Sequence, residues 1–281
     1  MQCSFEEVAY LLLWGELPTA QQLEAFAARV QRAAQSMPQT IVYCFQRLAE
    51  SSPQSSIMDV LRTGVSVLGQ LECDNGPAES LYDRDLSQQR YKAEQLLGQV
   101  PALLTIWIDC LRGRQPSPWP NKPLTTALLE KLCRTKVSDI AATAFNTTLI
   151  LYAEHEFNAS TFTARVCAST MSDIFSCVVA AIGSLKGPLH GGANEAAMEM
   201  IENWKTREEA NKNILEMLAN KGKIMGFGHA IYSERDPRNA VIKEFSKELS
   251  QEYGDDSLYQ VSEEVEQVMW DEKKLFPNAD F

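Results

Sequence analysis

Histidine is scarce in this sequence, with only three copies in 281 residues: His155, His190 and His229. They form no His-x-x-x-His pair and no His-Glu-x-x-His motif, so they lack the ligand spacing of common zinc sites. No Gly-x-Ser-x-Gly motif is present, which argues against a serine hydrolase built on the usual nucleophile turn. We therefore expect no metal site. A histidine metalloenzyme stays open as an alternative, because acidic residues lie near the rings.

Positive charge is also in deficit, with 26 Lys and Arg against 37 Asp and Glu and a net charge of -11. Binding to nucleic acid needs a basic face, so we expect no nucleic-acid partner; a small anion needs only local cations. No charge-free apolar run of about 18 residues occurs, and the N-terminus has neither the basic region nor the apolar core of a signal peptide. We expect no membrane partner and a cytoplasmic location, in a bacterium.

The seven cysteines show no C-x-x-C pair and no adjacent histidine; they are Cys3, Cys44, Cys73, Cys110, Cys133, Cys167 and Cys177. Scattered cysteines of this kind are typical of reduced packing residues in a reducing compartment.

Helical periodicity dominates the chain, and strand alternation is scarce. Ser4 and Glu7 have the spacing of a capping box, which predicts a helix that starts there and ends at Gly15. Further helices are expected over residues 19–36, 57–70, 88–112, 193–204, 208–219, 239–253 and 257–274, with an interruption near Pro101 and a proline-rich loop over residues 115–123. The pattern predicts an all-α protein.

Small and apolar residues are unusually dense over residues 137–185. This density predicts one or two helices buried on most sides, in a core or in a subunit interface. The glycine- and proline-rich stretch 183–192 follows and is the best candidate for a domain boundary or hinge.

Two of the histidines are flanked by glycines near expected helix starts. His190 precedes Gly191 and Gly192, where the positive end of a helix dipole would disfavour an imidazolium and leave a neutral donor for a developing oxyanion. His229 follows Gly226 and Gly228, which would let the backbone approach a ligand closely. Arg238 could recognise a carboxylate through two hydrogen bonds, although a solvated arginine is the default interpretation.

Together these motifs resemble the citrate synthase family. The resemblance covers nearly the whole chain, in the family's order, and its 2-methylcitrate synthase members are the most similar. It is carried by residues 58–64 (MDVLRTG), 155–165 (HEFNASTFTAR), 187–196 (GPLHGGANEA), 226–229 (GFGH), 236–238 (DPR) and 275–281 (LFPNADF).

The resemblance implies a citrate synthase-like fold of two helical domains, a large one over residues 1–187 and a small one over 188–281. It implies an enzyme that joins propionyl-CoA or acetyl-CoA to oxaloacetate and hydrolyses the thioester. In that reaction Asp280 is the base, His190 binds the thioester carbonyl oxygen, and His229 polarises the ketone and protonates the alkoxide. His155 and Arg238 hold oxaloacetate. The small domain would close over the large one about a hinge at residues 183–192.

The family's segment for recognition of CoA by the backbone corresponds to Lys223, Ile224, Met225, Gly226 and Phe227, with Lys221 and Lys223 as candidate phosphate partners. Acyl-CoA is a substrate, so the resemblance implies no cofactor, and it implies a homodimer. Family members usually extend beyond both ends of this sequence. Because a terminal residue is poorly ordered unless it is tied down, we expect the 281-residue chain to be impaired. The alternative is a relative that binds ligand without turnover.

Overall fold

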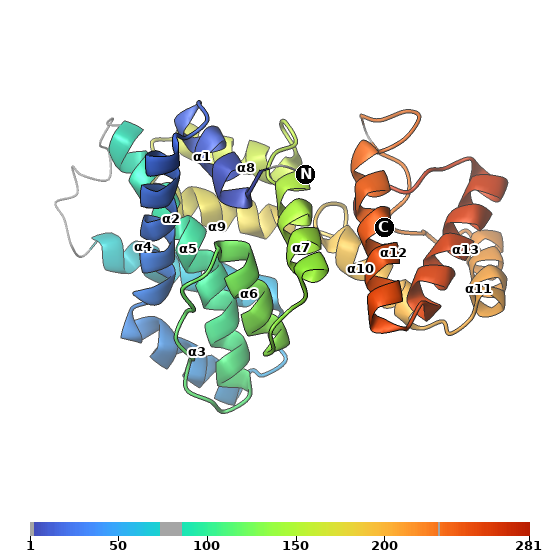
Figure 1. Ribbon diagram of the computed structural model, residues 1–281, viewed down its shortest axis with the longest axis horizontal. Coiled ribbons are helices and arrows are strands. Elements are labelled where there is room, and N and C mark those ends of the chain that lie inside the picture. The colour runs from blue at the N-terminus through green and yellow to red at the C-terminus, as the bar shows by residue number, and fades with distance from the viewer. Residues whose placement is uncertain (1–2, 74–85, 230) are drawn as a thin grey trace. The chain divides into compact units, whose positions relative to one another are not determined.

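The computed structural model describes residues 3–73, 86–229 and 231–281, apart from the side chain of Cys73. These residues form thirteen α-helices and, among them, no β-strand beyond one isolated antiparallel bridge between Phe227 and Pro277 (Figure 1). The predicted all-α class is confirmed. In the described part of the chain, no helix has the length and apolar character that crossing a bilayer requires.

The helices form two compact units, Met1–Leu185 and Lys186–Phe281, which we describe separately. The division falls within the stretch 183–192; the hinge motion assigned to that stretch stays a prediction. Unit 1 contains α1 (Phe5–Trp14), α2 (Ala20–Gln35), α3 (Gln39–Ser51), α4 (Ile57–Cys73), α5 (Leu86–Leu111), α6 (Leu124–Cys133), α7 (Asp139–Leu151), α8 (Ala159–Ser169) and α9 (Ile174–Leu185). Unit 2 contains α10 (Gly192–Glu202), α11 (Arg207–Ala219), α12 (Pro237–Tyr253) and α13 (Ser257–Lys273).

The first helix begins as its sequence predicts. The Ser4 Oγ accepts a hydrogen bond from the Glu7 backbone N–H at 3.2 Å, and the Ser4 N–H donates to the Glu7 carboxylate at 2.6 Å. The predicted interruption at Pro101 is wrong, because α5 runs through it without a break. Proline removes one helical hydrogen bond, but burial of the residues that follow it, including Leu103 and Trp107, holds the helix in place.

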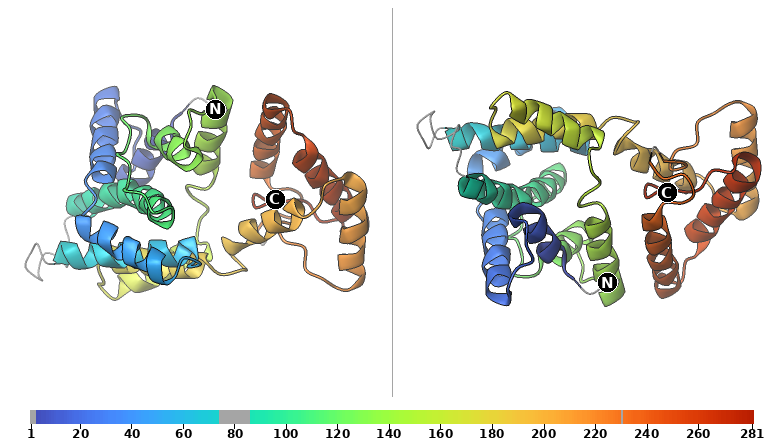
Figure 2. Two further views of the ribbon diagram at one scale, coloured as in Figure 1. Left: turned by 90° about the horizontal axis from the view of Figure 1, so that it is seen from below. Right: turned by 90° about the horizontal axis from the view of Figure 1, so that it is seen from above.

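Helix α5 is the centre of unit 1, and two apolar clusters form on it. One joins it to α3, α4 and α9 through residues such as Phe45, Val65 and Trp107. The other joins it to α1, α2 and α6 through residues such as Phe26 and Val30. Gly98 lets α2 and α5 approach closely, because a Cβ at this position would lie 2.1 Å from the Val30 carbonyl oxygen. The two helices lie side by side in both views of Figure 2.

Two buried carboxylates fasten unit 1 internally. Glu94 accepts hydrogen bonds from the Arg29 guanidinium and from the Trp14 indole N–H at 2.9 Å, linking α5 to α2 and α1. Glu6 accepts from the Leu124 N–H at 2.7 Å, which satisfies a donor at the first turn of α6. Glu94 is therefore paired with a cation and Glu6 is hydrogen-bonded, as buried polar groups generally are.

The apolar stretch 137–185 forms three helices, α7, α8 and α9, and not the one or two predicted. Helix α8 packs against α9 yet contains no fully buried residue, so burial on most sides is also wrong for α8 within the chain. Phe162 and Val166 are 59% and 51% exposed. This exposed apolar surface leaves the second alternative, a subunit interface, as a prediction.

The six cysteines whose side chains are described are free thiols; the prediction for Cys73 falls outside the described side chains. Burial raises the pKa of Cys177 to about 11, and a hydrogen bond with Cys167 acts in the same direction. Cys177 therefore stays protonated at neutral pH.

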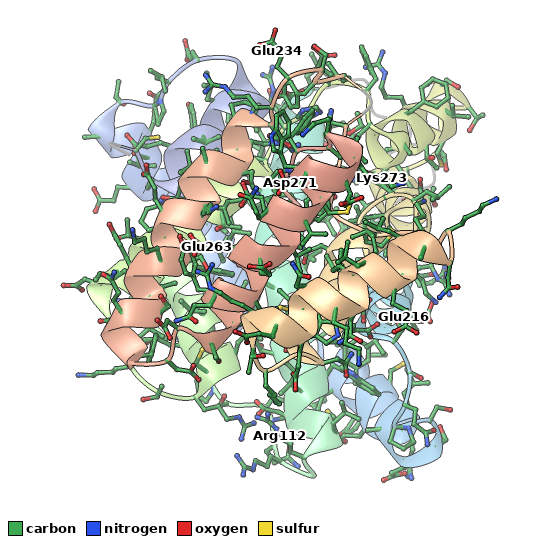
Figure 3. All side chains as sticks on the ribbon, turned by 90° about the vertical axis from the view of Figure 1, so that its right-hand side faces the viewer. Arg112, Glu216, Glu234, Glu263, Asp271 and Lys273 are labelled. Atoms are coloured by element: carbon green, nitrogen blue, oxygen red, sulfur yellow. The ribbon has the colours of Figure 1, made fainter. Side chains whose placement is uncertain are left out.

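Unit 2 is built on α13. Val261 and Val265 are fully buried against Ala210 and Ile214 of α11, in a cluster that also contains Ile224. Charged residues cover the outer side of these helices: Figure 3 labels Glu216 on α11 and Glu263 and Asp271 on α13.

Candidate active site

His190 lies in the turn that leads into α10. Its N–H donates to the Gly187 carbonyl at 2.9 Å, and its own carbonyl accepts from the Ala193 N–H at 2.9 Å. The helix begins two residues later, at Gly192, so the predicted position beside a helix start is confirmed. His190 is half-buried and lies beside the start of α10.

The hydrogen bonds around His229 determine where its ring can carry a proton. The Nδ1 atom accepts from the Ile231 N–H at 3.1 Å and from the Tyr232 N–H at 3.2 Å. An acceptor nitrogen carries no proton, so a neutral ring carries its proton on Nε2. His229 is therefore arranged to donate from Nε2, as polarisation of a ketone oxygen requires.

The segment before His229 is paired with the last residues of the chain. The Gly228 N–H donates to the Phe276 carbonyl at 2.8 Å, and the Asn278 N–H donates to the Gly226 carbonyl at 2.9 Å. The rings of Phe227 and Phe281 pack with centroids 4.5 Å apart. Gly226 and Gly228 have φ of +84° and +73°, which glycine adopts without strain.

The chain itself makes a close approach at Gly226, and the approach of a ligand to this backbone stays a prediction. A Cβ at Gly226 would lie 2.7 Å from the Cβ of Phe281.

We expect Gly226→Ala to destabilise unit 2 by about 1–3 kcal/mol, because it adds both left-handed strain and overpacking. It would also displace the C-terminal residues and lower activity. Chemical denaturation and activity assays would check this, with Gly254→Ala as the control. Gly254 has a φ of +67°, but a Cβ added there would meet no atom within 4 Å, so Gly254→Ala carries the strain alone. Equal effects of the two substitutions on activity would contradict the expectation.

Asp280, the predicted base, is held by its backbone. Its N–H donates to the Asn278 Oδ1 at 2.9 Å, and its carbonyl accepts from the Asn194 Nδ2 at 3.3 Å. Ala279, which precedes it, is buried. The second contact joins the backbone of Asp280 to α10, because Asn194 belongs to that helix and lies four residues after His190. Whether the 281-residue chain is impaired stays a prediction.

Arg238 makes a two-point contact with a carboxylate, and that carboxylate is Asp236. Its Nε donates to Oδ1 at 3.0 Å and its Nη2 donates to Oδ2 at 2.7 Å. The Asp236 side chain is fully buried and also accepts from the Ala279 N–H at 3.0 Å. Burial would raise the pKa of Asp236, but the hydrogen bonds from Arg238 and from Ala279 lower it below its usual value. The pair thus links the start of α12 to the residue before Asp280, and the role of Arg238 toward oxaloacetate stays a prediction.

In the predicted CoA segment, the side chains are divided between core and solvent. Ile224 is buried in the core of unit 2, Phe227 packs on Phe281, and Lys223 is exposed. The Gly226 carbonyl already accepts from Asn278. Recognition of CoA by the backbone of this segment, Gly226 included, stays a prediction.

His155 belongs to unit 1, in the connection between α7 and α8. It is half-buried, and Asn158 after it caps α8 by accepting from the Thr161 N–H at 3.0 Å. Within unit 2, by contrast, hydrogen bonds join the segments that carry His190, His229, Arg238 and Asp280. The structure therefore gathers four of the five predicted catalytic and oxaloacetate-binding residues onto connected segments of one unit.

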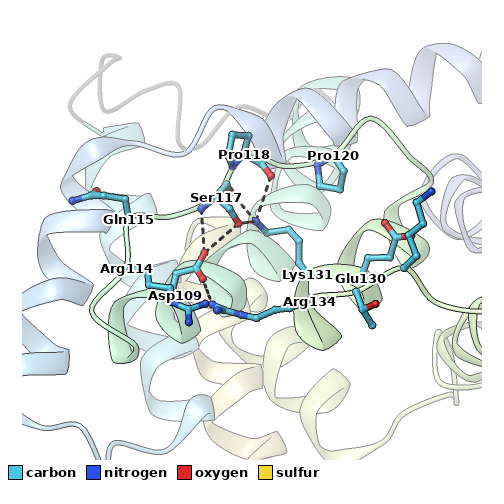
Figure 4. A pocket seen from close by; sticks show the side chains of 11 residues that line it. Asp109, Arg114, Gln115, Ser117, Pro118, Pro120, Glu130, Lys131 and Arg134 are labelled. Carbon is cyan, nitrogen blue, oxygen red and sulfur yellow. Dashed lines mark hydrogen bonds and ion pairs between the residues drawn. The ribbon is translucent and has the colours of Figure 1, made fainter.

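A pocket of about 540 Å³ lies in unit 1 and is lined by none of these residues (Figure 4). Asp109 accepts there from the Ser117 N–H at 3.1 Å and pairs with Arg134, while Lys131 donates to the Ser117 carbonyl at 2.8 Å. Burial lowers the pKa of Lys131, against the effect of Asp109. The contacts hold the proline-rich loop against α5 and α6, which is a structural role.

No group of His, Cys, Asp and Glu suited to a metal ion occurs among the described residues.

Sequence reasoning missed Asn194, Asp236 and Asn278, although all three lie in motifs that carried the resemblance. The Asp-Pro pair at 236–237 is a recognisable helix start, and Asp236 does cap α12. Asn194 and Asp236 bind the C-terminal segment, and Asn278 joins that segment to Gly228. These contacts connect distant parts of the chain, so they leave no periodic signal in the sequence.

Comparison with known proteins agrees with this fold. The family model described as "Citrate synthase, C-terminal domain" matches residues 1–281. The 2-methylcitrate synthase of Shewanella oneidensis is 47% identical over 281 residues, covering 99% of this chain and 71% of that protein. Citrate synthase 2 of Bacillus subtilis is 41% identical, covering 99% and 73%.

Solved structures give the same result. Citrate synthase from Pyrobaculum aerophilum superposes with a TM-score of 0.87 at 31% identity, covering 99% of this chain and 71% of that one. The citrate synthase of Thermoplasma acidophilum, solved as a ternary complex with carboxymethyl coenzyme A and oxaloacetate, gives 0.88 at 28% identity, covering 99% and 72%.

The fold and its relatives thus define an all-α acyltransferase. The chain belongs to the citrate synthase family, among enzymes of the citrate and 2-methylcitrate synthase type.

Proposed function

We propose that this chain condenses propionyl-CoA with oxaloacetate and hydrolyses the product thioester, releasing 2-methylcitrate and CoA. One observation carries the proposal: within unit 2, hydrogen bonds connect the segments that contain His190, His229 and Asp280. The higher identity to a 2-methylcitrate synthase than to a citrate synthase favours propionyl-CoA over acetyl-CoA.

In the proposed mechanism, the Asp280 carboxylate removes a proton from the carbon next to the thioester carbonyl. His190 donates a hydrogen bond to that carbonyl oxygen as the enolate forms. The enolate carbon then bonds to the ketone carbon of oxaloacetate, whose oxygen is polarised by the Nε2–H of His229 and receives that proton. Water finally cleaves the thioester, which gives a carboxylate, the free thiol of CoA and one proton released to solvent. The proton taken up by Asp280 returns to His229 through water, which restores both groups for the next turnover.

The base and the hydrogen-bond donor to the oxyanion are both needed, because a carbon acid next to a thioester is very weak. A placed base contributes roughly 10²–10⁴-fold, and one oxyanion donor contributes roughly 10²–10³-fold. His155 and Arg238 hold oxaloacetate in this scheme, and the backbone near Lys223 holds the adenine end of CoA.

Release of free thiol tests the proposal. Purified protein is mixed with oxaloacetate and either propionyl-CoA or acetyl-CoA, and thiol is followed with a chromogenic disulfide. We expect release only when both substrates are present, with the higher kcat/KM for propionyl-CoA. One methylene changes this ratio by roughly 10–200-fold. Binding of both ligands without thiol release would instead identify a relative that binds without turnover.

We also propose that two copies of the chain associate through α8. Its outer surface presents Phe162 and Val166, and exposed apolar patches of this kind mark interaction sites. A second copy is the proposed occupant because the resemblance to the citrate synthase family implies a homodimer.

Phe162→Glu should shift the protein from dimer to monomer in light scattering, because it places a charge in the interface. Leu17→Glu is the control, since Leu17 is 69% exposed between α1 and α2, away from α8. A wild-type protein that is monomeric at every concentration would contradict the proposal.

A further inference from the structure

Asn278 makes hydrogen bonds within its own C-terminal segment and to two other segments of unit 2. Its Oδ1 accepts from the Asp280 N–H at 2.9 Å, and its Nδ2 donates to the Gly228 carbonyl at 2.8 Å. Its backbone N–H donates to the Gly226 carbonyl at 2.9 Å, and its carbonyl accepts from the Asn239 Nδ2 at 2.9 Å. All four polar groups of this half-buried residue are therefore engaged.

Each side-chain partner of Asn278 is, or directly precedes, a residue of the proposed mechanism. The bond to the Asp280 N–H is a side-chain turn that fixes the backbone bearing the carboxylate. The bond to Gly228 fixes the residue before His229. A single planar amide thus spans the base and the residue before the proton donor, and its rigid geometry limits how far the two can separate.

The backbone contacts of Asn278 add the third segment. Asn239 follows Arg238, so its bond to the Asn278 carbonyl ties the start of α12 to the same point. Asp236 adds a further contact with this segment, because its carboxylate accepts a hydrogen bond from the Ala279 N–H.

We propose that Asn278 is a positioning residue that sets the distance between the Asp280 carboxylate and the His229 ring. The proposal rests on the proposed function, and it adds a residue that acts on the reaction without touching substrate. A displacement of about 1 Å in a reacting group can cost about 10²-fold in rate.

The test compares Asn278→Ala with Asn278→Asp. Alanine removes both side-chain bonds, whereas aspartate keeps an acceptor for the Asp280 N–H, loses the donor to Gly228 and adds a negative charge facing the Gly228 carbonyl. We expect Asn278→Ala to lower kcat by about 10–100-fold, with little change in KM for oxaloacetate, and Asn278→Asp to recover part of the loss. Asn213→Ala is the matched control, because Asn213 donates to the Glu209 carbonyl at 2.8 Å on α11, away from the site.

The outcomes are separable because wild type is measured in the same thiol-release assay. An active wild type with an Asn278→Ala variant of equal kcat would overturn the positioning role alone. Loss of kcat that follows loss of thermal stability, with no recovery in Asn278→Asp, would also overturn it, in favour of a purely structural role. A wild type that releases no thiol would overturn the proposed function and this inference together.

Discussion

Asp280→Asn is expected to lower thiol release by about 10²–10⁴-fold while leaving the fold intact. The carboxamide has nearly the shape of the carboxylate but cannot accept a proton from the carbon next to the thioester. The contacts that hold Asp280 to Asn278 and Asn194 involve its backbone N–H and carbonyl, which the substitution retains. Thermal unfolding and oxaloacetate binding should therefore stay close to those of wild type.

The matched control is Glu272→Gln, which neutralises an exposed carboxylate near the end of α13. It should leave the rate of thiol release unchanged. If Asp280→Asn keeps the wild-type rate, Asp280 is not the base and the proposed mechanism is wrong.

Loss of the His229 donor should have the second largest effect. His229→Asn places an oxygen near the position of Nδ1, where it can still accept from the Ile231 and Tyr232 N–H groups, but it supplies no donor at the position of Nε2. We expect kcat to fall by about 10²–10³-fold, as for removal of a single oxyanion donor.

His229→Gln distinguishes the donor from the rest of the ring. The longer side chain can place an N–H near the position of Nε2, so it should recover part of the activity that His229→Asn loses. The measurement is kcat with saturating oxaloacetate. Equal activity of His229→Asn and wild type would show that the Nε2 proton takes no part.

Local features of the fold were readable from the sequence because they depend on neighbouring residues. The capping box of Ser4 and Glu7 is one example, and the helical spacing of the apolar residues is another. Pro101 misled the prediction because packing around α5 outweighs the lost hydrogen bond. Helix α3 was not predicted, although Ile41, Val42, Phe45 and Leu48 have helical spacing; its start at Pro38 lacks a side-chain cap.

The site was readable only in part, for a related reason. His190, His229 and Asp280 have side chains whose chemistry suggests a role, and short motifs mark them. Asn278 and Asp236 act by holding other segments, and a hydrogen bond between residues 50 positions apart, such as that from Asn278 to Gly228, has no counterpart in local sequence. The conformation of Gly226 could be anticipated, but its close contact with Phe281 could not.

A crystal structure of this chain with oxaloacetate and carboxymethyl-CoA would test the central claim most directly. We predict that His190, His229 and the Asp280 carboxylate all lie within about 3.5 Å of the reacting atoms of the two ligands, in one shared pocket. Ligands bound elsewhere, or rings of His190 and His229 that face separate regions, would contradict it.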